Sequence, residues 1–134
     1  MVLHGRTCWL LEGRVVARSV GLGIVGLGGA GRAHLRRVQA KRKSQVVAVY
    51  DPNQAALSQV ADRLAGSAVG LATSDLEEFM AFSEIDGVSI CSPDHWDLEH
   101  VMRTQERGWH VPCEKPLATT AEHCQRIGEA AQPA

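Results

Sequence analysis

Residues 26–31 form a glycine-rich loop whose residue types suit the binding of phosphate groups. The loop fits the pattern G-x-G-x-x-G and consists of Gly26, Leu27, Gly28, Gly29, Ala30 and Gly31. Gly26 permits a tight turn, Gly28 lets the backbone come close to a pyrophosphate, and Gly31 lets the following helix lie tightly on a sheet. The N–H groups at the start of that helix would then face the anion. The loop therefore predicts a site for a nucleotide diphosphate.

Asp51 is the acidic partner that such a loop requires. It stands at the end of the apolar run 45–50, twenty residues after Gly31, where a carboxylate can accept hydrogen bonds from an adenosine ribose. Asp51 also suits the start of the turn 51–53, and both roles can hold together. A carboxylate here repels a 2′-phosphate and no arginine follows closely, so NAD is favoured over NADP. S-adenosylmethionine-dependent enzymes use a related loop and acidic residue, so these two elements alone leave the ligand open.

Short β-type runs alternate with helical patterns after residue 18, as expected of a parallel sheet with crossover helices. The expected strands are 20–25, 45–50, 68–72, 87–91 and 109–113. Helices are expected over 29–41, around 57–64, after Ser74, over 96–107 and from Thr119. We therefore predict a single α/β domain, a doubly wound parallel sheet (Rossmann-like), over residues 19–134. Residues 1–18 form an N-terminal extension to which no function is assigned.

Three details of these elements are specific enough to test. Ser74 with Glu77, and Thr119 with Glu122, have the spacing of capping boxes and are expected to begin two helices. Pro112 has no N–H to donate to a β-ladder, so the strand 109–113 should lie at an edge or end there.

Composition excludes several classes of protein. The net charge of −1 gives no long-range field for nucleic acid or anionic lipid, and no apolar run approaches membrane-spanning length. Basic residues at 36–37 and 41–43 fall near the end of a predicted helix, where they complement its dipole. The four cysteines show no C-x-x-C pair and no His/Cys metal spacing, so no metal site is expected. We expect a cytoplasmic protein with reduced thiols.

Two further segments, SPDHWDLEH (92–100) and HVPCEKPLA (110–118), join the glycine loop and Asp51. Together these elements resemble the N-terminal domain of the Gfo/Idh/MocA oxidoreductases, the group of glucose–fructose oxidoreductase and inositol 2-dehydrogenase. The resemblance covers about residues 19–130. Its most specific element is the motif Glu-Lys-Pro at 114–116 after a strand, and the resemblance implies that Pro116 sets a turn with a cis peptide bond.

The resemblance implies roles for several residues by their position. Ser92 and Pro93 would border the nicotinamide side of the cofactor, with His95 close by. Glu114 would contact the nicotinamide ribose region. Lys115 would lie beside the reacting carbon of the substrate, where its ammonium group would stabilise negative charge on the reacting oxygen during hydride transfer.

The function implied is that of the NAD(P)-binding domain of an oxidoreductase that transfers hydride between a nicotinamide and a sugar or polyol. Family members continue into an α/β substrate domain that supplies the usual acid–base histidine, and no residue of this sequence is assigned to it. The alternative is a non-catalytic nucleotide-binding or sensing protein derived from the family. Without that second domain, self-association through an exposed sheet edge is expected. Asp94 and Asp97 stand where family members often have asparagine and histidine.

Overall fold

Four parallel strands form the central sheet of the computed structural model, in the order β5-β4-β3-β6. The structure describes residues 10–11, 14–15, 18–113 and 115–131. The strands of this sheet are β3 (Val20–Val25), β4 (Ser44–Tyr50), β5 (Leu71–Thr73) and β6 (Gly87–Ile90). The helices are α1 (Gly29–Gln39), α2 (Gln54–Leu64), α3 (Leu76–Ala81), α4 (Asp94–Glu106) and α5 (Ala121–Ala130). The predicted α/β fold with a parallel sheet is confirmed.

The order of the strands creates a point where the chain reverses direction across the sheet. From β3 the chain moves outward through β4 to β5 and then crosses back to β6 on the other side of β3. At the carboxyl end of β3, Val25 pairs with Tyr50 on one side and with Ile90 on the other. In open α/β sheets ligands bind in the crevice outside such a switch point.

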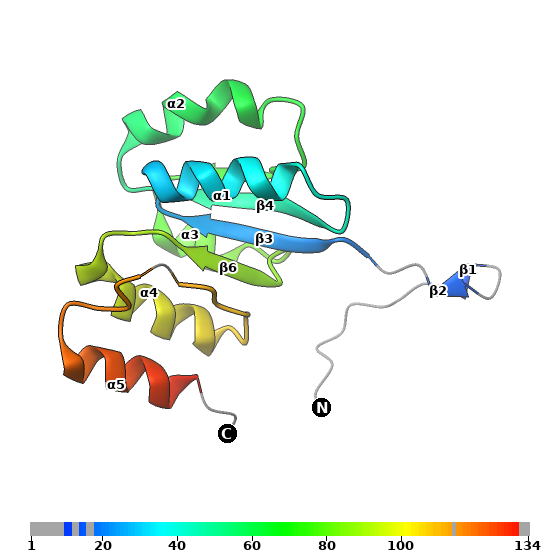
Figure 1. Ribbon diagram of the computed structural model, residues 1–134. Coiled ribbons are helices and arrows are strands. Elements are labelled where there is room, and N and C mark those ends of the chain that lie inside the picture. The colour runs from blue at the N-terminus through cyan, green and yellow to red at the C-terminus, as the bar shows by residue number, and fades with distance from the viewer. Residues whose placement is uncertain (1–9, 12–13, 16–17, 114, 132–134) are drawn as a thin grey trace.

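Helices cover both faces of the sheet, with α1 and α2 on one face and α3, α4 and α5 on the other (Figure 1). Because successive side chains of a strand point to opposite faces, Ile24 packs with Leu35 on the α1 side. Its neighbour Val25 packs with Phe79 and Val88 on the other side. Both clusters are nearly inaccessible to solvent, which explains why the β4 sequence shows no polar alternation.

The segment 109–113 runs parallel to β6 at the edge of the sheet but forms only two isolated bridges, Gly87 with His110 and Ile90 with Cys113. The amides of Val88 and Ile90 donate to the carbonyls of His110 and Pro112 at 2.8 and 2.9 Å. The bond that should return from residue 112 is absent because proline has no N–H. The predicted regular strand is therefore wrong, whereas its edge position and the reason for its interruption are correct.

Several predicted boundaries are also wrong, three of them at the start of an element. Helix α3 begins after Asp75, whose carboxylate accepts from the amides of residues 77 and 78, and not after Ser74. Helix α5 begins after Thr120, whose hydroxyl accepts from the amide of residue 123, and not after Thr119. In both cases the chosen cap stands one residue too early, because an adjacent side chain offers an acceptor of the same kind. Strand β5 begins at Leu71, later than the expected 68.

Most of the N-terminal extension lies outside the described residues. Its described part contains β1 (Leu10–Leu11), which pairs antiparallel with β2 (Arg14–Val15). The Arg18 guanidinium donates to the Asp86 carboxylate at 2.6 Å and joins the extension to the sheet. No helix in the part of the chain that the structure describes is both long and apolar enough to cross a membrane.

Candidate functional site

Two glycines of the loop are required by the closeness of neighbouring backbone. Gly26 has φ +90°, in the left-handed region that favours glycine, and a Cβ there would lie 2.6 Å from the carbonyl oxygen of Cys91. A Cβ on Gly31 would lie 1.8 Å from the carbonyl oxygen of Gly26. The tight turn and the close approach of α1 to β3 that the motif predicts are therefore both present.

Gly28 and Gly29 differ from these two because they border open space. Among the described residues, no atom lies within 4 Å of a Cβ placed at either position. The first N–H groups of a helix have no acceptor within the helix, and Gly28, the N-cap of α1, has no side chain that could accept from them. Leu27 is 1% exposed as a whole residue and packs in the core, and its amide bonds to Asp51.

Asp51 is fixed between the loop and the following turn. One carboxylate oxygen accepts the Leu27 amide at 2.8 Å, and the other accepts the Asn53 amide at 2.8 Å. The predicted turn-starting role is confirmed by the second bond. A carboxylate has about four acceptor sites, so two remain for a ligand. The first bond orients the carboxylate beside the open end of α1.

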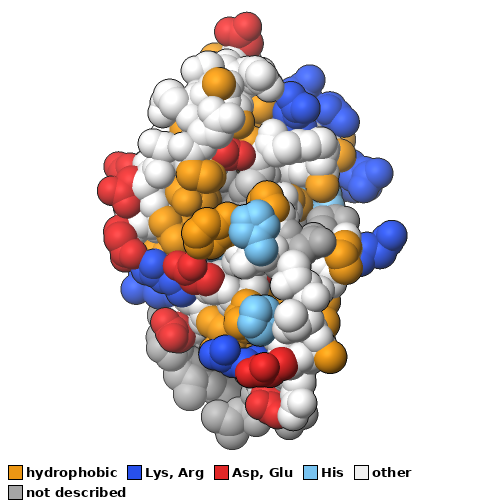
Figure 2. Space-filling model, turned by 90° about the vertical axis from the view of Figure 1, so that its left-hand side faces the viewer, with side chains coloured by type: hydrophobic (Ala, Val, Ile, Leu, Met, Phe, Trp, Pro, Cys, Tyr) orange, Lys and Arg blue, Asp and Glu red, His pale blue; other side chains and the backbone are white. Residues whose placement is uncertain are grey.

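A cleft of about 620 Å³ opens at the carboxyl ends of the strands. Seven of the predicted site residues line it: Gly26, Gly28, Gly29, Ala30, Asp51, Ser92 and Pro93. The strand arrows in Figure 1 end on the face that Figure 2 presents, and Figure 2 shows hydrophobic side chains gathered near the middle of that face, beside a histidine. Elements separated by more than 60 residues thus meet at one site.

The other predicted site residues do not line this cleft. Leu27 and Gly31 are buried beneath the loop, while His95 on α4 and Lys115 are exposed. The peptide bond between Lys115 and Pro116 is cis, as the resemblance implies. Glu114 lies outside the described residues.

The structure adds cleft residues that sequence reasoning did not select: Tyr50, Pro52, Leu76, Trp96, Glu99 and His100. Trp96 and His100 are four residues apart on α4, so they share one face of the helix. This four-residue spacing, which begins four residues after Ser92, is the sequence signal that could have placed both side chains at the cleft. The other added residues are Tyr50, Pro52, Leu76 and Glu99. Their residue types alone do not show whether they line a pocket, pack in the core or lie on the surface.

A partly buried chain of hydrogen bonds supports the α4 side of the cleft. The Ser92 hydroxyl donates to the Asp97 carboxylate at 2.8 Å, and Ser92 Oγ lies 2.8 Å from His100 Nδ1. Because a hydroxyl has one proton and a carboxylate only accepts, we assign the Nδ1 proton to His100. Asp97 is 1% exposed and does not line the cleft. It is therefore a support for Ser92, without direct access to a ligand.

Burial keeps two ring side chains of the cleft uncharged near neutral pH. Burial lowers the pKa of His100 below its usual 6.5, against a smaller opposite effect of Glu99. Burial, followed by the charge of Asp51, raises the pKa of Tyr50 above 10.0. The wall that His100 and Tyr50 form is therefore neutral as well as largely apolar.

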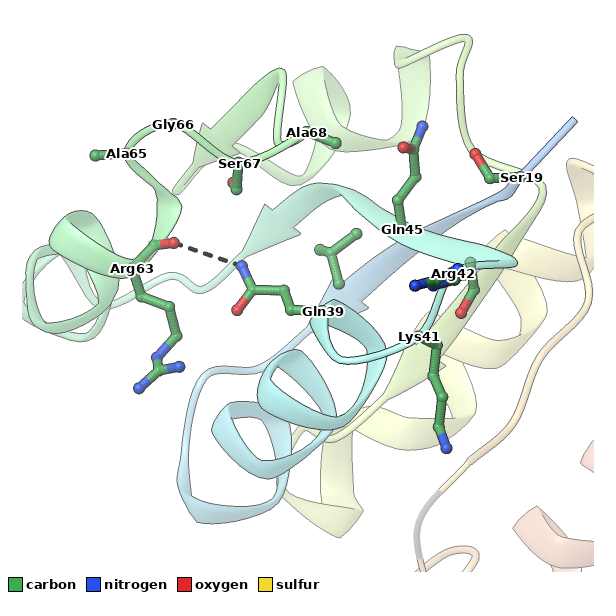
Figure 3. A pocket seen from close by; sticks show the side chains of 12 residues that line it. Ser19, Gln39, Lys41, Arg42, Gln45, Arg63, Ala65, Gly66, Ser67 and Ala68 are labelled. Atoms are coloured by element: carbon green, nitrogen blue, oxygen red, sulfur yellow. Dashed lines mark hydrogen bonds between the residues drawn. The ribbon is translucent and has the colours of Figure 1, made fainter.

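A second cavity, of about 490 Å³, lies at the opposite end of the sheet, where α1 and α2 end. It is lined in part by Lys41, Arg42 and Arg63. In Figure 3 the side chains of Lys41 and Arg63 extend from separate elements and do not converge on one point, and Gln39 donates to the carbonyl of Arg63 at 3.4 Å. These cations lie beside helix carboxyl ends, where they offset the helix dipoles, so this cavity is not assigned as the functional site.

Comparison with known proteins identifies the family. The model of the Gfo/Idh/MocA oxidoreductase family, NAD-binding Rossmann fold, matches residues 20–134. The chain belongs to the Gfo/Idh/MocA family. Its described part has the architecture of the NAD-binding Rossmann domain of that family, and the glycine loop at the switch point is where such domains hold the dinucleotide.

Relatives within the Gfo/Idh/MocA family include an inositol 2-dehydrogenase/D-chiro-inositol 3-dehydrogenase from Shouchella clausii, 39% identical over 84% of this chain and 32% of the relative. The scyllo-inositol dehydrogenase of Lactobacillus casei, solved with NAD(H) and scyllo-inositol, is 25% identical with a TM-score of 0.75 over 84% of this chain and 33% of its own. The WlbA dehydrogenase of Bordetella pertussis, solved with NADH and UDP-GlcNAcA, is 27% identical. The match has a TM-score of 0.73 and covers 87% of this chain and 33% of the WlbA chain. The chain therefore spans about a third of the length of these relatives.

Proposed function

We propose that this chain is the NAD(H)-binding part of an oxidoreductase that transfers hydride between a nicotinamide and a sugar or polyol. The observation that carries the proposal is the open end of α1, where uncapped N–H groups lie beside the carboxylate of Asp51, itself fixed by the Leu27 amide. Among known ligands, a dinucleotide diphosphate with its adenosine ribose suits this pairing of anion donors and hydroxyl acceptor. Sugar and polyol dehydrogenases of the family support the substrate class.

In this proposal the diphosphate rests on the N–H groups at the start of α1 and the adenosine ribose bonds to Asp51. The nicotinamide lies toward Ser92 and Pro93, near the carboxyl end of β6. By the resemblance to the family, Lys115 of the Glu-Lys-Pro motif takes the position beside the reacting carbon. Its ammonium group donates to the substrate oxygen and stabilises the negative charge that develops there.

Titration with NADH, followed by nicotinamide fluorescence, tests the cofactor part of the proposal. The chain is expected to bind NADH and to bind it more tightly than NADPH, because the Asp51 carboxylate repels a 2′-phosphate. A protein that binds neither dinucleotide contradicts the proposed function.

Asp51→Asn is expected to weaken NADH binding roughly tenfold, since a hydrogen bond to a charged group contributes about 1.5–3 kcal/mol. The same change removes the negative charge, so the preference for NADH over NADPH should shrink or reverse. Asp62→Asn makes the same charge change on an exposed position of α2, outside the cleft lining, and serves as the control. Equal effects of the two substitutions on the NADH/NADPH ratio would contradict the role of Asp51.

Lys115→Ala is expected to lower turnover by about 10²–10³-fold, as for other groups that stabilise a developing oxyanion. NADH affinity should stay unchanged because Lys115 does not line the dinucleotide cleft. The measurement is NADH formation over a panel of polyols and sugars, with Lys41→Ala at the opposite end of the sheet as control. If the unsubstituted chain binds NADH and turns over none of the panel, activity by this chain alone is excluded.

A further inference from the structure

Trp96 is the most exposed of the large hydrophobic side chains among the described residues, at 49% exposure. It extends from the first turn of α4 and borders the same cleft as the glycine loop. An indole ring half open to water leaves apolar surface without a partner. A ligand bound in the cleft could therefore cover this apolar surface of the Trp96 ring.

The Trp96 ring is supported by the side chain of His100. Its plane is stacked on His100, with centroids 6.3 Å apart and an interplanar angle of 23°. His100 is 5% exposed, bonds to Ser92, and meets the Tyr50 ring edge-on at 6.1 Å. Since each of these supports is buried or hydrogen-bonded, the indole forms a preorganised wall of the cleft, and ordering it on binding costs little conformational entropy.

The position of the wall relative to Asp51 indicates what it receives. The glycine loop and Asp51 supply polar groups to the cleft, as do Ser92 and Glu99, while Pro52 and Leu76, which follow β4 and β5, supply apolar surface. Pro52 directly follows Asp51, so a base attached to a ribose at Asp51 lies near this apolar surface. A planar heteroaromatic base attached to the ribose at Asp51 loses little and gains stacking.

We infer that Trp96 is the residue that positions the adenine base of the dinucleotide, which lies against the indole ring. This inference rests on the proposed function and assigns one end of the same cleft. Two sides of the cleft then bind different parts of the dinucleotide. The main chain of the glycine loop and Asp51 bind the diphosphate and the ribose, and the aromatic side chain on α4 binds the base.

Fluorescence of a chain with Trp96 as its single tryptophan reports the contact directly. The sequence has three tryptophans, so Trp9→Phe/Trp109→Phe leaves Trp96 alone. ADP-ribose carries adenine but no nicotinamide, so it cannot accept excitation energy as NADH does, and it is expected to change the Trp96 emission by contact. Nicotinamide mononucleotide is expected to leave that emission unchanged. The reverse pattern would place the ring at the nicotinamide end and overturn the inference.

Affinity supplies the second measurement. Trp96→Ala is expected to weaken ADP-ribose and NADH binding roughly tenfold, the scale of one base–aromatic stack, and Trp96→Phe is expected to restore most of it. Trp109→Phe is the control, since Trp109 packs on Phe79 away from the cleft. Unchanged ADP-ribose affinity in Trp96→Ala overturns this inference alone. A wild-type chain that binds neither ADP-ribose nor NADH overturns the proposed function with it.

Discussion

Gly28→Val is expected to abolish measurable NADH binding while the protein stays folded. The backbone at residue 28 has φ −68° and ψ −162°, an extended conformation open to any residue. A Cβ there meets no described atom within 4 Å, so the valine side chain is accommodated by the protein itself. It occupies the space over the N–H groups of α1 that the diphosphate needs. Loss of several charge-assisted hydrogen bonds predicts a fall in affinity of about 100-fold or more.

The measurements are NADH titration and urea unfolding of the same samples. The free energy of unfolding should change by less than about 1 kcal/mol, as for other substitutions at open surface positions. Gly128→Val is the matched control, because Gly128 on α5 also faces open space and does not line the cleft. NADH affinity that survives Gly28→Val would show that the diphosphate does not rest on this loop.

The sequence predicted those parts of the site whose chemistry depends on local backbone geometry. The strand, loop and helix around residues 26–31 lie where the pattern places them, because glycine at Gly26 and Gly31 is dictated by close backbone contacts. Asp51 follows its strand as predicted, and the turn it begins is present. These features are local in sequence, so a single motif specifies them.

Features that depend on contacts between distant elements were not predicted. The aromatic wall of Trp96 and His100 becomes a pocket wall only because α4 faces the loop after β4, more than 40 residues earlier in the chain. Asp97, which stands where family members often have histidine, is 1% exposed and accepts a hydrogen bond from Ser92, and neither its burial nor this partner follows from the local sequence. The segment 109–113 has strand-forming residues, but Pro112 removes the hydrogen bond that would make the ladder continuous.

Gly31→Ala is expected to destabilise the fold strongly, in contrast to Gly28→Val. Alanine at a helix position normally gains about 1 kcal/mol over glycine. Here the added methyl would lie 1.8 Å from the carbonyl oxygen and 2.8 Å from the carbonyl carbon of Gly26. Both atoms belong to a backbone turn that cannot rotate away, so α1 must move off β3. Overpacking typically costs about 1–3 kcal/mol and occasionally more, and a backbone clash this close belongs at or above the upper end, so it outweighs the gain in helix propensity.

Urea unfolding of Gly31→Ala should therefore show a loss of about 2–3 kcal/mol, a large share of the roughly 5–15 kcal/mol that stabilises a domain. Gly29→Ala is the matched comparison, since Gly29 lies in the first turn of the same helix and a Cβ there meets no described atom within 4 Å. That variant should be as stable as the wild type or more so. If Gly31→Ala proved equally stable, α1 would not lie as close to β3 as the loop requires. The α1 N–H groups would then not be held at the position from which they face the diphosphate.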